Sequence, residues 1–301
     1  MEHINRFKEE YLRQLAQVGS FKDSWPVFQR EIENHLSNPI SGQSIFDLGD
    51  HLQEIFKANS TEGRGQGSLS GGGAAWECLV SWYVNFVLWN TPTIAVRQNK
   101  KFVPKAISDC TTVTIYNNQT NTESDILLFD IPQHKELKGD SLKDIQFHLS
   151  TRLQLTTLVV LQCKTNWNDN AQIPMLWDMI YNSESRLSSV SVGVNGYSPK
   201  SLRNFKYAFA TVPSNTNAVY KPTSVSVLRV KGLTGGNYWG RATTPDVAAS
   251  IKELASRHFS SLMGGGAIAH IENNLAADAD FSRRFLELDF ESASDQEELG
   301  L

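Results

Sequence analysis

The first part of the chain has apolar residues spaced three and four positions apart. This spacing occurs in "INRFKEEYLRQLAQV" (4–18) and in "WPVFQREIENHL" (25–36), and it predicts helices across residues 3–58. A glycine-rich stretch at 60–73 predicts a loop. The strongly apolar run that follows, residues 74–89, predicts a buried helix. The chain therefore begins with a helical region.

Strand-like segments dominate the middle of the chain. Runs rich in β-branched and aromatic residues predict strands at 111–117, 124–131, 156–164, 189–194, 206–212 and 224–232. Helical patterns predict helices at 171–182, 244–263 and 267–289, the second of which starts with threonines and a proline. Helices, then strands flanked by a helix, then helices again indicate a mixed α/β fold.

The composition is that of an ordinary globular protein, with 40% hydrophobic and 20% charged residues among 301. We expect a helical N-terminal region at 1–60, a main domain at 61–290 and an acidic tail at 291–301. The chain lacks an apolar run of the ~18 residues needed to cross a bilayer, so a membrane partner is not expected.

The net charge of −4 does not favour general binding to polyanions. Residues 287–301 hold six acids and no base, so removing these six negative charges from −4 leaves +2 on residues 1–286. Such a tail is typical of a solvated chain end. The overall charge therefore neither supports nor excludes a nucleic-acid partner.

The three cysteines are Cys78, Cys110 and Cys163, which are far apart and odd in number. They fit neither a disulfide framework nor a zinc ribbon. The N-terminus is charged and amphipathic, without the apolar core of a signal peptide. A reducing cytoplasm is the expected location.

The stretch "LVVLQCKTNW" (158–167) ends an apolar strand with polar groups. Because side chains alternate along a strand, Gln162 and Lys164 share one face. Asp125 opens the strand predicted at 124–131 and would lie beside them if the two strands are neighbours. Burying such groups is costly unless they bind each other or an ion. The periodicity alone is equally consistent with a structural Asp–Lys ion pair and with a site.

The order Asp125, then Gln162-Cys163-Lys164, resembles the PD-(D/E)XK nuclease motif, in which an acid opens one strand and acid-or-glutamine, any residue, lysine follow on the next. The glutamine form is similar to that of Mrr-type nucleases. Glu77, on the apolar helix before both strands, matches a glutamate that many members carry there. The resemblance covers residues 70–185 and is greatest to type II restriction endonucleases.

The resemblance implies a restriction-endonuclease-like mixed sheet flanked by helices, and a prokaryotic homodimer that cuts double-stranded DNA with Mg²⁺. It implies that Asp125, Glu77 and the backbone carbonyl of Cys163 bind the metal, that Gln162 adds an amide oxygen or orients a water, and that Lys164 acts on the attacking water and the phosphate. Asp130 or Glu123 could replace Asp125 as the main acid, and Glu77 could instead be a surface charge.

Two segments could contact DNA. The first supplies Asn166, Asn168, Asn170 and Gln172, which could equally cap the next helix, and the second supplies Tyr238 and Arg241 in a glycine-rich stretch that could be a plain turn. Three functions therefore stay open: a site-specific restriction enzyme, a nuclease without sequence specificity in repair or antiphage defence, and a catalytically inert relative that binds DNA.

Overall fold

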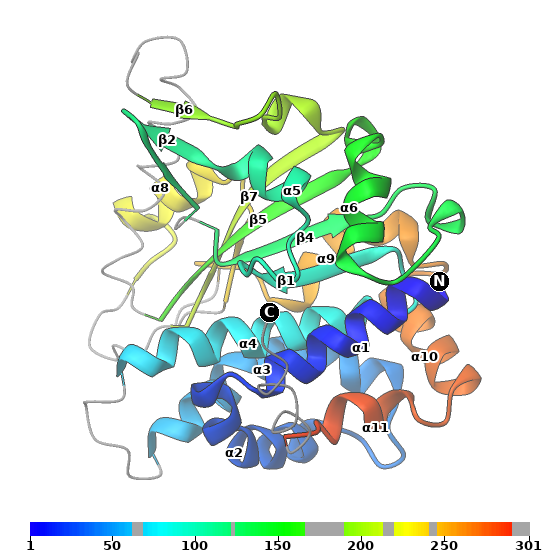
Figure 1. Cartoon of the computed structure of the whole chain (residues 1–301). Coiled ribbons are helices and arrows are strands. Elements are labelled where there is room, and N and C mark those ends of the chain that lie inside the picture. The colour runs from blue at the N-terminus through cyan, green and yellow to red at the C-terminus, as the bar shows by residue number, and fades with distance from the viewer. Residues whose placement is uncertain (62–68, 122–123, 166–189, 213–219, 241–245, 291–301) are drawn as a thin grey trace.

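The structure is a computed structural model, and it describes residues 1–61, 69–121, 124–165, 190–212, 220–240 and 246–290. Figure 1 shows a central sheet with helices α1 to α4 gathered below it, and with α5, α6 and a small second sheet above it. The mixed α/β class is confirmed.

The central sheet has five strands in the order β1-β4-β5-β7-β8. Strands β1, β4 and β5 are antiparallel neighbours, whereas β7 runs parallel to β5 and β8 runs parallel to β7. A parallel neighbour requires a crossover, and the chain between β5 and β7 supplies it. The strands are β1 (Thr93–Arg97), β4 (Ile126–Asp130), β5 (Thr157–Lys164), β7 (Asn204–Thr211) and β8 (Tyr238–Trp239).

The N-terminal helices follow the predicted spacing closely. They are α1 (Glu2–Ala16), α2 (Gly19–His35), α3 (Gly42–Thr61) and α4 (Leu69–Val87). Helix α4 contacts β1, β5 and the other three helices, so its apolar side chains, such as Trp76 and Trp82, are fully buried. One continuous hydrophobic core joins these helices to the sheet.

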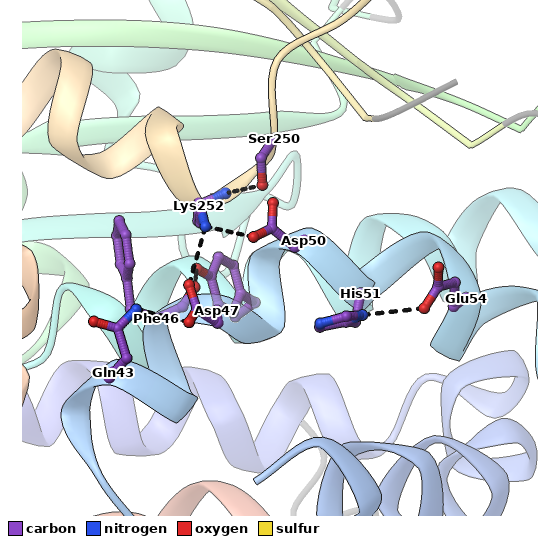
Figure 2. A network of polar contacts seen from close by, with 9 residues as sticks. Gln43, Phe46, Asp47, Asp50, His51, Glu54, Ser250 and Lys252 are labelled. Carbon is purple, nitrogen blue, oxygen red and sulfur yellow. Dashed lines mark hydrogen bonds and ion pairs between the residues drawn. The ribbon is translucent and has the colours of Figure 1, made fainter. Parts of the chain in front are cut away.

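Two lysines tie the helices to the rest of the molecule. The buried Lys8 ammonium donates to the carbonyls of Leu88 (2.7 Å) and Thr91 (3.1 Å), just past the end of α4. Lys252, at the start of α9 (Lys252–Phe259), forms ion pairs with Asp47 and Asp50 of α3 (Figure 2).

Smaller elements lie on both sides of β4 in the sequence. The second sheet has the order β3-β2-β6. Helix α6 begins at a capping box in which the Ser141 hydroxyl accepts the Asp144 backbone N–H at 3.1 Å. These elements are α5 (Lys105–Thr111), β2 (Val113–Ile115), β3 (Asn118–Thr120), α6 (Leu142–Ser150) and β6 (Val190–Val192), with short 3₁₀ turns at His134–Glu136, Leu153–Leu155, Pro199–Ser201 and Ser260–Leu262.

Several predicted elements were wrong. Residues 224–232 form helix α8 (Val225–Leu233) instead of a strand, because Val227 and Val230, three positions apart, are the residues that it buries. The helix predicted at 244–263 begins only at Lys252, after the backbone at Ala249 bridges to Trp239.

The structure differs from the predicted elements in three further places. The helix predicted at 267–289 is two helices, α10 (Ala267–Ala277) and α11 (Phe281–Leu286). Helix α4 begins at Leu69, inside the stretch 60–73 that was predicted as a glycine-rich loop. Strand β1 was not predicted at all. The helix predicted at 171–182 lies outside the described residues.

Candidate active site at one edge of the central sheet

Strands β4 and β5 are neighbours, as the sequence argument required. Ile126 pairs with Leu161 in antiparallel register. Asp125 therefore lies at the same end of these two strands, here named the sheet edge, as Gln162 and Lys164. The Asp125 carboxylate accepts the backbone N–H of Cys163 through Oδ2 at 2.7 Å. Charge-assisted bonds of this kind fix a carboxylate firmly. Asp125 is therefore held against the end of β5.

Successive residues of β5 direct their backbone N–H and C=O groups alternately toward β4 and toward β7. The Lys164 carbonyl accepts the Val212 N–H at 2.9 Å, on the side of β7. The N–H and C=O of one residue in an antiparallel ladder point the same way. Since the N–H of Cys163 points to Asp125, its carbonyl also lies on the β4 side of β5.

The Gln162 side chain is buried, with 1% of its surface exposed. Its Oε1 accepts a hydrogen bond from the Tyr207 hydroxyl on the next strand, β7. A buried amide oxygen needs such a donor. This contact fixes the orientation of Gln162.

Charged groups surround the Cys163 thiol. Burial, and then the negative charges of Asp125 and Glu77, raise the pKa of this thiol well above its ordinary value, while Lys164 and Arg97 act in the opposite direction. The thiol is therefore neutral, and Cys163 can offer its carbonyl but not a thiolate. Three charges of the predicted site, Asp125, Glu77 and Lys164, therefore act on this one residue, together with Arg97.

Glu77 reaches the sheet from helix α4. Its Oε2 accepts two hydrogen bonds from Arg97 at the end of β1, one from Nη2 at 2.7 Å and one from Nε at 2.9 Å. The Glu77 side chain is 19% exposed and that of Arg97 is 25% exposed, so Glu77 is not a solvated surface charge. An acid on an apolar helix needs this kind of partner.

Glu77, Arg97 and Asp125 line one cavity of about 920 Å³. Much of its remaining described lining is polar, and three further cationic or acidic side chains contribute: Lys100, Lys105 and Asp109. Lys105 and Asp109 are paired with each other at 2.7 Å. The cavity is large enough for a small ligand or part of a polymer.

The alternative acid Asp130 lies at the other end of β4. Its Oδ1 accepts the Thr157 N–H at 2.5 Å, and its Oδ2 lies 3.0 Å from Nη2 of Arg203. Burial raises the pKa of Asp130, against the opposing effects of that N–H and of Arg203. With the strand between them, Asp130 cannot join Gln162 and Lys164, and Glu123 lies outside the described residues.

The expected DNA contacts fall almost wholly outside the described residues. Tyr238 is described, and it is 1% exposed with its ring packed edge-on against Phe209, so in this structure it belongs to the core. The acidic tail at 291–301 is not described either. The undescribed candidates are Asn166, Asn168, Asn170, Gln172 and Arg241.

Sequence reasoning missed Arg97 and Tyr207. Arg97 directly follows the apolar run "TIAV". A cation at the end of a buried strand is the same signal that pointed to Lys164. Tyr207 lies on a strand that was predicted, but its contact with Gln162 depends on which strands pair. A single sequence does not give that pairing.

The lining of the cavity includes two carboxylates of the predicted site. Mg²⁺ typically binds one or two protein carboxylates together with waters and substrate phosphates, and Glu77 and Asp125 line the same space. Among the residues that the structure describes, a group of three potential His, Cys, Asp or Glu ligands occurs only in the N-terminal helices. The cavity thus offers these two carboxylates, of which Glu77 is paired with Arg97.

Comparison with known proteins gives no match, whether with family models, curated proteins or solved structures. In the part of the chain that the structure covers, each helix is too short or too polar to cross a membrane.

Proposed function

We propose that the protein is a Mg²⁺-dependent endonuclease that cuts double-stranded DNA, with the restriction-endonuclease-like core and the homodimeric, site-specific action of a type II restriction enzyme. A two-fold dimer matches a palindromic site and presents one catalytic centre to each strand.

One observation carries the proposal. Glu77 from α4 and Asp125 from the start of β4 line the same cavity, and Asp125 is hydrogen-bonded to the backbone between Gln162 and Lys164. In the nuclease motif these would be the helix acid, the strand acid and the Q-x-K element. Gln162 and Lys164 are not among the residues that line the cavity, and they relate to it through the bond from the Cys163 N–H to Asp125. Lys164 is partly exposed there, which suits contact with a substrate.

The chemistry follows from these groups. Glu77, Asp125 and the Cys163 carbonyl would hold the Mg²⁺, which polarises a phosphate and lowers the pKa of a bound water. Lys164 would neutralise charge on the phosphate and orient the attacking water. Gln162, held by Tyr207, would keep the end of β5 in register with Asp125.

A catalytically inert DNA-binding relative is the second candidate. The observation that favours it is the Glu77–Arg97 pair, because a guanidinium that donates twice to one carboxylate oxygen competes with a metal for that charge. In a nuclease, Mg²⁺ together with DNA phosphates would have to draw Glu77 or Arg97 into a new arrangement.

The deciding experiment is digestion of unmethylated phage DNA with Mg²⁺, with EDTA, and with Ca²⁺. We expect cleavage in Mg²⁺ or Mn²⁺, none in EDTA and little in Ca²⁺, which is larger and more loosely coordinated. Discrete fragments with one end sequence would support a restriction enzyme, and a smear would support a nuclease without sequence specificity. Binding without cutting in every metal would support the inert relative, and full activity in EDTA would reject the site.

A further inference from the structure

Three metal-ligating side chains meet where α2 and α3 lie together, apart from the sheet-edge residues. His35 is the last residue of α2, and His51 and Glu54 lie three positions apart on α3. One ligand atom from each residue lies within 4.8 Å of the others. Figure 2 shows His51 and Glu54 facing each other along α3.

The spacing of these atoms suits a tetrahedral ion. His51 Nδ1 and Glu54 Oε2 are 3.0 Å apart, and two ligands at ~2.1 Å from a tetrahedral Zn²⁺ are separated by roughly 3.4 Å. The ion would take the place of the proton that this hydrogen bond holds. The pair is therefore arranged close to the distance that coordination needs.

The two imidazoles stack with their centroids 4.0 Å apart and their planes 14° from parallel. Ring nitrogens bind metals in the plane of the ring, so one imidazole has to turn before both can reach one ion. The ring that turns is His35, half-buried at the last position of α2, so that His51 keeps its distance to Glu54.

The electrostatics also suit a cation. His35 and His51 can each offer one ring nitrogen to a cation. Glu54 adds a negative charge at the exposed side of the group. Two imidazoles and one carboxylate form the donor set of many zinc sites in which water is the fourth ligand.

We propose that His35, His51 and Glu54 bind one divalent transition-metal ion of the Zn²⁺ class, which ties the end of α2 to α3. Imidazole ligands favour Zn²⁺ and similar ions, whereas Mg²⁺ prefers oxygen. The site is thus chemically distinct from the proposed magnesium site, and it does not depend on the nuclease proposal.

Calorimetric titration of the full-length, tag-free protein with Zn²⁺, after removal of metals, tests the site. We expect one binding event that excess Mg²⁺ does not suppress. His35→Ala, His51→Ala and Glu54→Gln should each weaken it at least about tenfold, since even outer-sphere partners change metal affinity by that much. His134→Ala and Glu10→Gln, which alter a histidine and a glutamate elsewhere, should leave it unchanged.

Thermal unfolding separates lost binding from lost folding. Zn²⁺ should raise the Tm of the native protein, because a ligand that binds the folded state stabilises it, and should not raise that of the three variants. If His51→Ala melts at a far lower temperature without metal, His51→Gln is used in its place, since glutamine keeps a polar partner for Glu54. Equal Zn²⁺ affinity in native protein and ligand variants, or no binding at all, would overturn the proposal whatever the outcome of DNA cleavage.

Discussion

Asp125 directly precedes strand β4, and Asp130 is its last residue. The two carboxylates accept the same kind of hydrogen bond but differ in exposure and in ion partner. Asp125 and Asp130 each accept a backbone N–H from β5, from Cys163 at 2.7 Å and from Thr157 at 2.5 Å. Asp130 is 5% exposed and has an arginine, Arg203, as its ion partner. Asp125 is partly exposed and lines a cavity together with a second acid.

The difference separates a covered acid with an arginine partner from a partly exposed acid that lines a cavity. A covered carboxylate that is paired with a cation and with a backbone donor has its bonding satisfied within the protein. A partly exposed carboxylate that lines a cavity is the kind of group that the proposed magnesium site needs. The same strand thus supplies an internal control for every test of the proposed site.

The largest expected effect is on DNA cleavage. Asp125→Asn keeps the shape of the side chain but removes a metal-binding charge, so the rate should fall at least about a hundredfold, since metal stabilisation of the transition state is worth several kcal/mol. Asp130→Asn should cut within a few-fold of the native rate at a temperature where it is folded. Single-turnover cleavage of one plasmid site measures both. The reverse ranking would mean that Asp130 is the main acid.

Lys164 should have the next largest effect. Lys164→Ala should lower the cleavage rate by about a hundredfold, the scale of one lost charge-stabilising donor. Binding of duplex DNA in Ca²⁺ should change far less, because one phosphate contact among several is a small part of the affinity. Lys138→Ala, an exposed lysine outside the site, is the matched control. Native cleavage by the Lys164 variant, with a native melting curve, would leave the lysine without a catalytic role.

The sequence predicted the strands of this site better than the contacts between them. The apolar runs of β4 and β5 were visible, and the alternation along β5 placed Gln162 and Lys164 on one face. Strand β1 was missed, although Arg97 ends it and binds Glu77 from 20 positions away. Long-range pairs such as this one depend on sheet order, which local periodicity does not encode.

Helix α8 shows how local pattern can mislead. The sequence "SVSVLRV" alternates small polar and β-branched residues and so predicts a strand. In the fold, Val227 and Val230 pack in a small core with Phe209 and Tyr238, while Val225 and Leu228 are exposed. Tertiary packing therefore decided this segment against its intrinsic preference.

A stability effect should appear at the other end of β4. Arg203→Met leaves Asp130 buried without its cation, and because Arg203 is itself 53% exposed, the loss should be about 1–2 kcal/mol, between the values for surface and buried pairs. Urea unfolding should show a lower midpoint with an unchanged slope. Arg13→Met, which removes an exposed ion pair with Glu10, is the control arginine variant. An unchanged midpoint would show that the Asp130–Arg203 pair contributes nothing measurable.

The smallest expected effect is a change in how stability depends on pH. Burial raises the pKa of Asp130 above its ordinary value of 3.8, so the folded protein holds this proton more tightly than the unfolded chain does. Where pH lies between the unfolded and the folded pKa, unfolding releases a proton, and this carboxyl therefore contributes stability at low pH that is lost as pH rises through that window.

Arg203→Met removes the cation that opposes the shift, so the window should widen toward higher pH. Urea midpoints from pH 3.5 upward, compared among native protein, Arg203→Met and Asp130→Asn, isolate this group because the asparagine variant lacks it. If the native protein and Asp130→Asn have parallel pH profiles, Asp130 is not perturbed, and the contrast between the two ends of β4 rests on the cavity alone.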